Sequence, residues 1–288
     1  MNVAALRTFL TIIETGSLVQ AAAVLNVTQS TVTARLQSLE AELGQTLLNR
    51  PKTGVTLTAA GLRLQKYAET ITDLWRQAQQ EAALPGAFGA VCNIACHPDL
   101  WPGLGAMWFN AIRVEQPNVA LSVILGGQGE LSEWIKSGRA DLVIGFGAHA
   151  QAGQELFPLI TDQIRLYSTN PDSPIKFDPG YVFVDHGPEF SRQHAAAYAD
   201  AATARLNFGT ATLALEHVLR FGGSVYLPER IAADAVTEGN LWALDAPTFR
   251  RAAFLVINRT AAGRWDWITE MIRRFQDDKG SVSTDERP

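Results

Sequence analysis

The stretch Leu25–Glu40, written LNVTQSTVTARLQSLE, most constrains what this 288-residue chain can fold into. Val27, Val32, Leu36 and Leu39 recur at helical spacing, so one face of a short helix is apolar. The opposite face opens with small polar residues and one arginine: Thr28, Gln29, Ser30, Thr31, Thr33 and Arg35. Threonine is a mediocre helix former, because its branched side chain loses rotamer freedom against the preceding turn. Helix stability therefore does not explain why these polar residues stand on this face.

A helix-turn-helix is the motif that the neighbouring residues predict. The apolar spacing of a helix recurs over residues 2–14, 18–25 and 28–43. Small polar residues and glycines stand where these helices would begin, turn and end: Gly16, Ser17, Asn26, Thr28 and Gly44. Asn26 tolerates the left-handed conformation that a tight turn needs. In such a motif the second helix enters the major groove of DNA, with its first residues at the base edges.

The polar face of residues 28–43 suits contact with DNA. Hydroxyl and amide groups are compact, donate and accept hydrogen bonds, and can reach bases or phosphates. Gln29 can read adenine, and Arg35 can read guanine or contact a phosphate. Residues 47–58 predict a two-stranded wing, whose Arg50 and Lys52 would contact the flanking backbone or the minor groove. A merely solvated helix face is the alternative, which the order of cap, turn, wing and long helix disfavours.

Charge adds little to this interpretation. The formal net charge of the whole chain is −5, although a basic patch is the usual electrostatic mark of nucleic-acid binding. Residues 1–58 hold four basic and three acidic residues, so their net charge is +1. The remainder holds 20 basic and 26 acidic residues. The motif, rather than the charge, therefore carries the prediction of DNA binding.

Residues 59–83 predict one long helix with an apolar seam. Spacings of four and three alternate along it, as in a coiled coil, at Leu64, Ala68, Ile71, Trp75, Ala78 and Ala82. The flanks of the seam are polar nearly throughout, which favours an exposed dimerisation helix. A surface helix packed on its own domain is the alternative. Residues 84–89, LPGAFG, end the helix and form the expected linker.

After residue 89 the periodicity changes to that of an α/β protein. Short apolar runs, such as residues 90–95 and 140–147, alternate with helical segments, such as residues 102–116. Strands that alternate with helices predict a parallel sheet. Residues 263–275 close the pattern with a helix, and the charged tail over 279–288 is expected to be disordered.

Length and composition bound the remaining possibilities. A chain of 288 residues that is 47% hydrophobic can form two or three domains with sizeable cores. Its apolar runs fall short of the roughly 18 residues that a membrane helix needs. The N-terminus lacks the basic start and the cleavage site of a signal peptide. We therefore expect a cytoplasmic protein with no membrane partner.

The first 65 residues resemble a known family. Residues 2–65 look like the N-terminal winged helix-turn-helix domain of LysR-type transcriptional regulators, nearly without gaps. The matching positions are Phe9, Gly16-Ser17, Ala21-Ala22, Leu25, TQSTVT at 28–33, Leu39-Glu40, Leu43-Gly44, Arg50 and LTAAG at 57–61. Leu48 stands where the family usually has phenylalanine, and Ala34 where many members carry arginine. The second departure shifts the expected base contacts toward Arg35.

The resemblance extends more loosely to about residue 275. It implies an effector domain of two α/β lobes joined by two crossing strands, like a periplasmic-binding protein. On that basis the expected organisation is a DNA-binding domain over 1–58, a linker helix and hinge over 59–89, and an effector domain over 90–278, with lobe one at 90–162 and 256–278 and lobe two at 163–255. Leu100-Trp101 and residues 185–190 are similar to one subgroup, which includes an enterobacterial repressor of the flagellar master operon.

The effector is expected where strands end. In open α/β sheets, ligands lie at the carboxyl ends of strands, against helix N-termini, and the resemblance implies the same places. Three such ends supply the candidate lining: His97, Asp99, Trp101, Gln128, Thr210 and Thr212. Because Asp99 adds negative charge, a carboxylate effector would need a protonated His97 or another cation. Helix capping or loop structure is the alternative role for each residue.

Other chemistries compete with this interpretation. The GGQG run at 126–129 lacks the Lys-Ser/Thr of a phosphate loop, so nucleotide binding is discounted. Cys92 and Cys96 could form a thiol redox switch, although two small buried hydrophobic residues are the favoured interpretation. Cys96 beside His97 resembles a thiolate–imidazole pair, but no orienting group accompanies it. We therefore expect neither catalysis nor a cofactor or metal.

The hypothesis that follows is a LysR-type regulator. It would bind an imperfect palindrome of double-stranded DNA as a homodimer or homotetramer, and a small-molecule effector between the lobes would change its oligomer geometry. RNA polymerase is a further candidate partner. The competing hypothesis is a solute-binding or enzymatic α/β protein with an accessory helical domain. Affinity for DNA that falls steeply with salt would separate the two.

Overall fold

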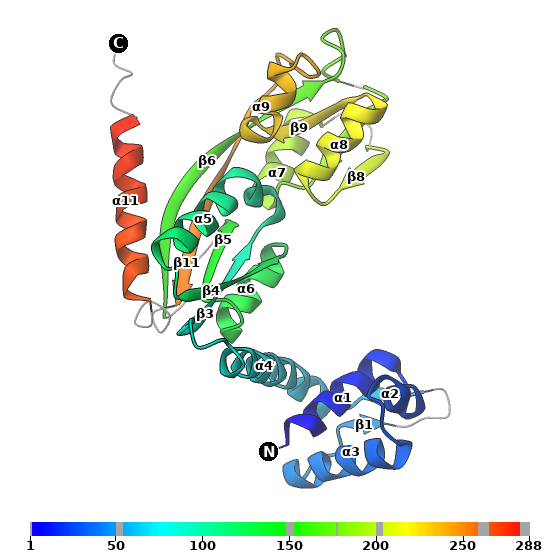
Figure 1. Cartoon of the computed structure of the whole chain (residues 1–288). Helices are drawn as coiled ribbons and strands as arrows, with labels where there is room; N and C mark the ends of the chain where they lie inside the picture. The colour runs from blue at the N-terminus through cyan, green and yellow to red at the C-terminus, as the bar shows by residue number, and fades with distance from the viewer. Residues whose placement is uncertain are drawn as a thin grey trace. The chain divides into compact units, whose positions relative to one another are not determined.

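The computed structural model describes residues 2–49, 54–147, 153–176, 178–199, 204–258 and 265–282, without the side chains of Gln80 and of residues 276–282. The chain forms two compact units, Met1–Ala90 and Val91–Pro288 (Figure 1). The first unit is mainly helical. The second holds one large mixed sheet with helices packed on both faces.

The first unit is a winged helix-turn-helix. Its elements are α1 (Val3–Thr15), α2 (Leu18–Val24), α3 (Gln29–Leu43), β1 (Leu48–Asn49), β2 (Thr56–Leu57) and α4 (Ala59–Ala82). The predicted caps are confirmed, because the hydroxyls of Ser17 and Thr28 accept N–H groups of the first turns of α2 and α3. Asn26 takes the left-handed conformation, with φ 53°. Strands β1 and β2 pair antiparallel as the wing, and the predicted contacts Arg50 and Lys52 lie outside the described residues.

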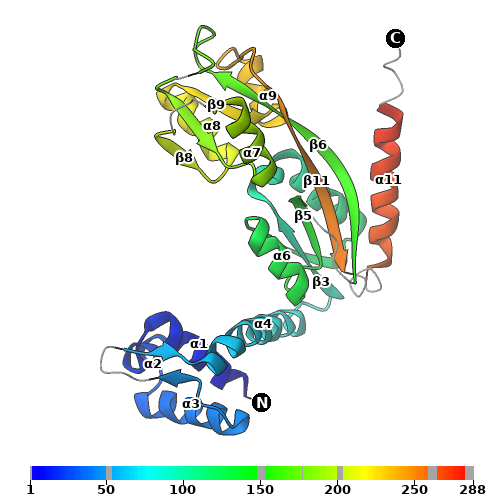
Figure 2. The same ribbon diagram turned by 180° about the vertical axis from the view of Figure 1, so that it is seen from behind.

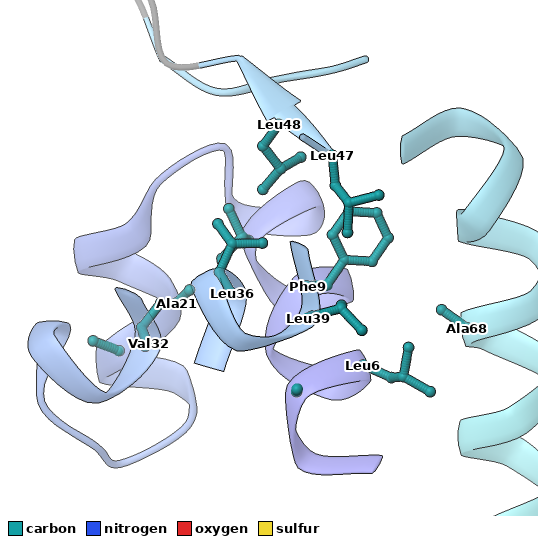
Figure 3. Close-up of a cluster of buried hydrophobic side chains, with 12 residues drawn as sticks. Leu6, Phe9, Ala21, Val32, Leu36, Leu39, Leu47, Leu48 and Ala68 are labelled. Atoms are coloured by element: carbon teal, nitrogen blue, oxygen red, sulfur yellow. The ribbon is translucent and has the colours of Figure 1, made fainter. Parts of the chain in front are cut away.

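A single apolar core holds α3 in place within this unit. Figure 3 shows Leu6 and Phe9 of α1 in one cluster with Leu36 and Leu39 of α3. Leu6 lies on the side of Ala68 of α4, and the ring of Phe9 lies beside Leu47. Phe9 and Leu36 are both fully buried. Burying side chains of this size contributes about 1.5–3 kcal/mol each. Packing of this core, rather than helix propensity, therefore holds the threonine-rich helix α3 rigidly against α1.

The predicted seam of α4 is divided between two environments. Ala68 is fully buried in the core of the first unit, and Leu64 and Ile71 pack against that core. Trp75, by contrast, is 50% exposed, and two further seam residues beyond it are also exposed, Ala78 and Ala82. The prediction that all six residues form one dimerisation seam therefore needs correction. The N-terminal half of the seam packs on its own domain, because α1 covers it, and only the C-terminal half is accessible.

Gly61 marks a close approach between the wing and the first turn of α4. A Cβ atom at this position would lie 2.2 Å from the backbone oxygen of Leu47. Because that neighbour is backbone, it cannot move aside as a flexible side chain would. We expect Gly61→Ala to destabilise the first unit by about 1–3 kcal/mol, measured by urea unfolding followed by circular dichroism. Gly86→Ala is the control, since nothing lies within 4 Å of its added Cβ, and equal midpoints would contradict the prediction.

In the described part of the second unit, one nine-stranded sheet runs through two lobes. Its order is β4-β3-β5-β11-β6-β9-β7-β8, and β10 pairs with β6. The elements are β3 (Ala90–Cys96), a 3-10 turn η1 (Pro98–Leu100), a kinked turn η2 (Trp101–Gly105), α5 (Ala106–Glu115), β4 (Val119–Leu125), α6 (Gln128–Ser137), β5 (Leu142–Phe146), β6 (Gln154–Ser168), β7 (Tyr181–Val184), α7 (Pro188–Ala197), β8 (Leu206–Phe208), α8 (Ala211–Phe221), β9 (Ser224–Pro228), α9 (Glu229–Thr237), β10 (Trp242–Ala243), β11 (Phe249–Asn258) and α11 (Asp266–Val282).

Two long strands join the lobes of the second unit. β6 and β11 pair antiparallel over most of their length and extend through both lobes, as Figures 1 and 2 show. Lobe one gathers β3, β4 and β5 with α5 and α6, and lobe two gathers β7, β8 and β9 with α7, α8 and α9. The predicted crossing strands are therefore present. They make the sheet mixed, whereas the alternation of strands and helices predicted a parallel one.

The C-terminal helix extends beyond its predicted end. We expected a disordered tail over 279–288, but α11 continues to Val282. The apolar face of α11 drives its packing, because Ile268 and Ile272 are buried and Phe275 contacts Trp108 of α5. Trp265, directly before the helix, is buried as well. Among the described residues, we found no helix with the length and apolar content needed to cross a bilayer.

Candidate functional site

The start of α3 presents a cluster of hydroxyl groups. Thr28 caps the helix, and its Oγ1 accepts the backbone N–H of Thr31 at 3.2 Å. The same Oγ1 lies 2.8 Å from the hydroxyl of Ser30 and 2.9 Å from that of Thr31. Thr28, Gln29 and Ser30 are exposed, while Thr31 and Thr33 are partly exposed. The cluster offers donors and acceptors at a helix N-terminus, where the backbone dipole also favours phosphate oxygens.

Arg35 lies in a different environment from the hydroxyl cluster. It is partly buried, and its Nη1 donates to the hydroxyl of Thr8 on α1 at 3.5 Å. Thr8 is itself fully buried and donates to the backbone oxygen of Ala4. In this structure Arg35 therefore helps to hold α3 against α1. Contact of Arg35 with a base or a phosphate stays a prediction. Gln29, the other predicted base reader, is exposed.

A buried carboxylate joins the two lobes of the second unit. Asp99 lies on η1, directly after β3 of lobe one, and is 1% exposed. Its Oδ1 accepts the backbone N–H of Ala211 at 2.8 Å and that of Thr212 at 3.3 Å, at the N-terminus of α8 in lobe two. Those two N–H groups have no partner within their own helix. A side chain of lobe one thus caps the N-terminus of a helix of lobe two.

His97 beside Asp99 is neutral. Its Nδ1 accepts the backbone N–H of Asp99 at 3.2 Å, and its ring meets Phe146 edge-on at 4.9 Å. Burial, reinforced by Arg251 and by His186, lowers the pKa of His97 to about 3. A protonated His97 is therefore unavailable to offset Asp99 at neutral pH.

Arg251 is a cation that could offset the negative charge of Asp99 for a carboxylate effector. The sequence analysis did not identify it. Its guanidinium lies 3.5 Å from the ring centre of Phe146. Burial lowers the pKa of Arg251 to about 10, opposed by the carboxylates of Asp99 and Asp162, so Arg251 stays charged at neutral pH. Its Nη1 is buried and has no hydrogen-bond partner among the described residues. Arg251 follows Arg250 at the start of the mainly apolar run 249–258, and this pair of arginines was the only signal in the sequence.

Two further groups near this cluster were also missed. His186 follows β7, and its Nε2 lies 2.9 Å from the backbone oxygen of Tyr226. Its Nδ1 is buried with no partner among the described residues. Arg230 of α9 binds the buried Asp162 of β6 through two hydrogen bonds, of 2.8 Å and 2.9 Å. These residues come from a loop, a helix and a strand far apart in the chain, so no local spacing marked them as neighbours.

The remaining predicted effector residues have separate local roles. Thr210 caps α8 by accepting the N–H of Leu213. Trp101 packs edge-on against Phe109 of α5. Gln128 is exposed at the first residue of α6. Of the six predicted residues, the structure brings together His97, Asp99, Thr210 and Thr212. A metal-binding cluster of three or more acidic, His or Cys side chains is absent from the described residues.

Comparison with known families accounts for both units. Residues 3–62 match the model of the bacterial regulatory helix-turn-helix protein, lysR family, and residues 87–264 match the model of the LysR substrate binding domain. The chain belongs to the LysR family of transcriptional regulators. A curated relative, the HTH-type transcriptional regulator HdfR of Escherichia fergusonii, is 28% identical over 233 residues, which is 79% of this chain and 82% of that protein.

Solved structures of LysR regulators share the fold. CbnR, a LysR family transcriptional regulator, superimposes with a TM-score of 0.70 at 19% identity, over 96% of this chain and 99% of CbnR. DarR of Vibrio fischeri, solved in complex with DNA, superimposes with a TM-score of 0.56 at 18% identity, over 93% of this chain and 98% of DarR. The predicted family and fold class are therefore confirmed.

The two cysteines of this LysR regulator cannot form the redox switch that we considered. Both lie in the one continuous strand β3 and are buried. Four residues of strand separate their Cα atoms by about 13 Å. A disulfide needs Cα atoms within about 7 Å of each other. The fold therefore excludes a disulfide between Cys92 and Cys96.

Burial also suppresses thiol reactivity. Burial raises the pKa of Cys96 to about 12, so its reactive thiolate is scarce at neutral pH. We expect neither thiol to react with Ellman's reagent at pH 7.5 within minutes in the native protein, whereas both react in denaturant. The Cys92→Ser and Cys96→Ser variants assign any reaction that is seen. A rapid native reaction that Cys96→Ser abolishes would contradict the prediction.

Proposed function

We propose that this LysR regulator reads duplex DNA with the start of α3, and that a small molecule bound between its lobes changes its oligomer geometry and hence transcription. The observation that carries the first part is the hydroxyl and amide cluster at Thr28–Thr31, which is exposed at its first three residues and is held on α3 by the core of the unit. The first residues of the second helix are the ones that meet base edges in helix-turn-helix proteins. The wing residues Arg50 and Lys52 remain proposed phosphate contacts.

The exposed apolar side of α4 supports assembly into homodimers or homotetramers. Tyr67, Leu74 and Trp75 are each more than 40% exposed. Large apolar side chains that gather on one helix mark a protein–protein contact more often than scattered ones do. A pair of first units joined in this way would present two copies of α3, which fits an imperfect DNA palindrome.

The proposed effector site is the buried polar cluster between the lobes. Asp99 already ties lobe one to the N-terminus of α8 in lobe two. Arg251 and His186 each keep a buried nitrogen without a partner among the described residues, which costs free energy until a ligand supplies an acceptor or a donor. A ligand that binds Arg251, or that displaces Asp99 from α8, would change how the lobes are held together. A ligand can shift the balance between two arrangements of the lobes only if its contacts differ between them.

The remaining parts of the proposal follow from transcription control. The protein would act in the cytoplasm, where it meets its DNA, and RNA polymerase would be a partner when it activates. The proposal includes neither a catalytic role nor a cofactor.

Salt-dependent DNA binding tests the proposed function. We would measure fluorescence anisotropy of the labelled intergenic DNA upstream of the protein's own gene, over a salt series, with random DNA of equal length alongside. We expect preference for the upstream DNA and a linear fall of log affinity with log salt concentration. If the protein has no affinity for either DNA even at low salt, the competing hypothesis of a solute-binding α/β protein stands instead.

A further inference from the structure

Lobe two contains a cavity that shares none of its residues with the cluster between the lobes. Its volume is about 690 Å³, within the range of roughly 300–1,000 Å³ typical of small-molecule sites. It lies beside α7, on the face of the sheet formed by β9, β7 and β8. Neither the cluster of Asp99 and Arg251 nor helix α8 contributes to its lining. It is therefore a separate candidate binding site.

Uneven helix cover explains why this cavity forms. Along β7, Val182 and Val184 face α8 and α9, whereas Tyr181 and Phe183 face α7. Successive residues of a strand point to opposite faces, so each face must be covered separately. Two helices cover the first face, whereas among the described elements the ten-residue helix α7 is the one that packs against the second. Large aromatic side chains fill part of the second face and leave a hollow beside α7.

Aromatic rings make up the wall of the cavity. The ring of His194 stacks on Tyr181 at 5.8 Å and meets Phe183 edge-on at 5.5 Å. Tyr198 and Tyr226 continue the wall, with ring centres 6.2 Å apart. Aromatic pairs favour such offset and edge-on contacts, and a flat ligand ring would extend the same packing.

The hydroxyl groups in this wall are already bonded within the protein. Tyr226 donates to the backbone oxygen of Pro247 at 3.0 Å, so the proton in its 2.6 Å bond with Tyr198 must come from Tyr198. Tyr181 Oη lies 2.8 Å from His194 Nε2. Burial raises the pKa values of Tyr181 and Tyr226, so both phenols are neutral. The wall therefore suits an uncharged, flat ring.

Two cations line the cavity without a carboxylate partner in the part of the chain that the structure describes. Lys176 and Arg205 are exposed lining residues, and neither forms an ion pair with the described residues. The neighbouring carboxylate, Asp178, is engaged elsewhere: it accepts the N–H of Gly180 at 2.8 Å and the hydroxyl proton of Ser224. The positive charge is thus left for a ligand. We propose that this cavity binds a small aromatic carboxylate, with its ring among Tyr181, Phe183 and Tyr198 and its carboxylate at Lys176 and Arg205.

Isothermal titration calorimetry of the full-length protein with 2-naphthoate tests the proposal. Naphthalene-2-carboxamide, which has the same ring and no charge, serves as the matched probe. We expect saturable binding of one 2-naphthoate per chain, about 5- to 30-fold tighter than the carboxamide at low salt. Absence of saturable binding at 10 mM, or equal affinity for the two probes, would overturn the proposal.

Paired variants locate the site. Ala195 on α7 is exposed and lines the cavity, whereas Ala196 is exposed and does not line it. We expect Ala195→Trp to weaken 2-naphthoate binding about 10-fold or more by filling the hollow, and Ala196→Trp to leave it within about twofold. Equal affinity in the two variants, with native circular dichroism, would overturn the proposal.

A charge variant keeps the test independent of the inserted tryptophan. Lys176→Gln combined with Arg205→Gln should abolish the preference for 2-naphthoate over the carboxamide and leave carboxamide binding unchanged. Arg220→Gln on α8, on the other face of the sheet, is the charge control and should change neither affinity. A preference that survives the double substitution would overturn the assignment of the cations. DNA binding does not enter any of these measurements, so they stand apart from the test of the proposed function.

Discussion

The Arg230→Met variant should lose about 3–5 kcal/mol of folding free energy in the second unit. Arg230 holds Asp162 through two parallel hydrogen bonds, and Asp162 is 5% exposed. Removing the guanidinium leaves a buried carboxylate without its partner, which costs far more than the pair itself contributes. In a unit of this size we expect the unfolding temperature to fall by roughly 10 °C, measured by calorimetry.

A second ion pair between the same two elements provides the control. Arg165 of β6 lies 3.4 Å from Glu229 of α9, but both side chains are more than 40% exposed. Because water screens exposed pairs, Arg165→Met should cost about 0–1 kcal/mol. A similar loss of stability in both variants would show that burial of Asp162 is not the cause.

Acid should destabilise the second unit through two buried histidines. Burial lowers the pKa of His97 to about 3 and that of His186 to about 4, whereas each would titrate near 6.5 in the unfolded chain. Below pH 6.5 the unfolded chain therefore binds protons that the folded unit does not, so the folding free energy falls as the pH falls. Each histidine contributes a slope of about 1.4 kcal/mol per pH unit down to its folded pKa.

The His186→Gln variant isolates this contribution. The raised pKa of Asp99 acts in the opposite direction, because its folded form takes up a proton more readily, but it acts equally in both proteins. Urea unfolding between pH 7 and pH 4.5 should therefore show a shallower loss of stability in the variant, by about 1.4 kcal/mol per pH unit at most. Parallel pH profiles for the two proteins would contradict the account.

The helix-turn-helix was predictable because its determinants are local. Ser17, Asn26 and Thr28 act through bonds and backbone angles within a few residues of themselves, and the structure places them as the spacing indicated. The lobes were predictable only with the family resemblance. The alternation of strands and helices indicated a parallel sheet, and the antiparallel pairing of β6 with β11 depends on contacts about 90 residues apart.

The contacts in the site between the lobes could not be predicted from local sequence patterns. Position in the sequence marked Asp99 as a residue at a strand end, and the structure shows that it caps a helix 112 residues away. Arg251 and Asp162 carry no local signal beyond a charge within a strand that holds other charged residues as well. Ala68 likewise fitted a heptad seam, but whether such a residue faces a partner or its own core depends on where α1 packs.

Comparison of Gln29→Ala with Gln37→Ala tests the central claim, that the start of α3 reads DNA. Both glutamines are exposed on α3, but Gln29 begins the helix and Gln37 lies two turns further on. The pair avoids Arg35, which also supports the packing of α3 against α1. The quantity to measure is the ratio of affinities for upstream and random DNA, by anisotropy at one salt concentration. The account predicts that Gln29→Ala lowers this ratio by about 5- to 150-fold, equivalent to 1–3 kcal/mol, while Gln37→Ala leaves it within about twofold. An unchanged ratio for Gln29→Ala, or an equal loss in both variants, would contradict it.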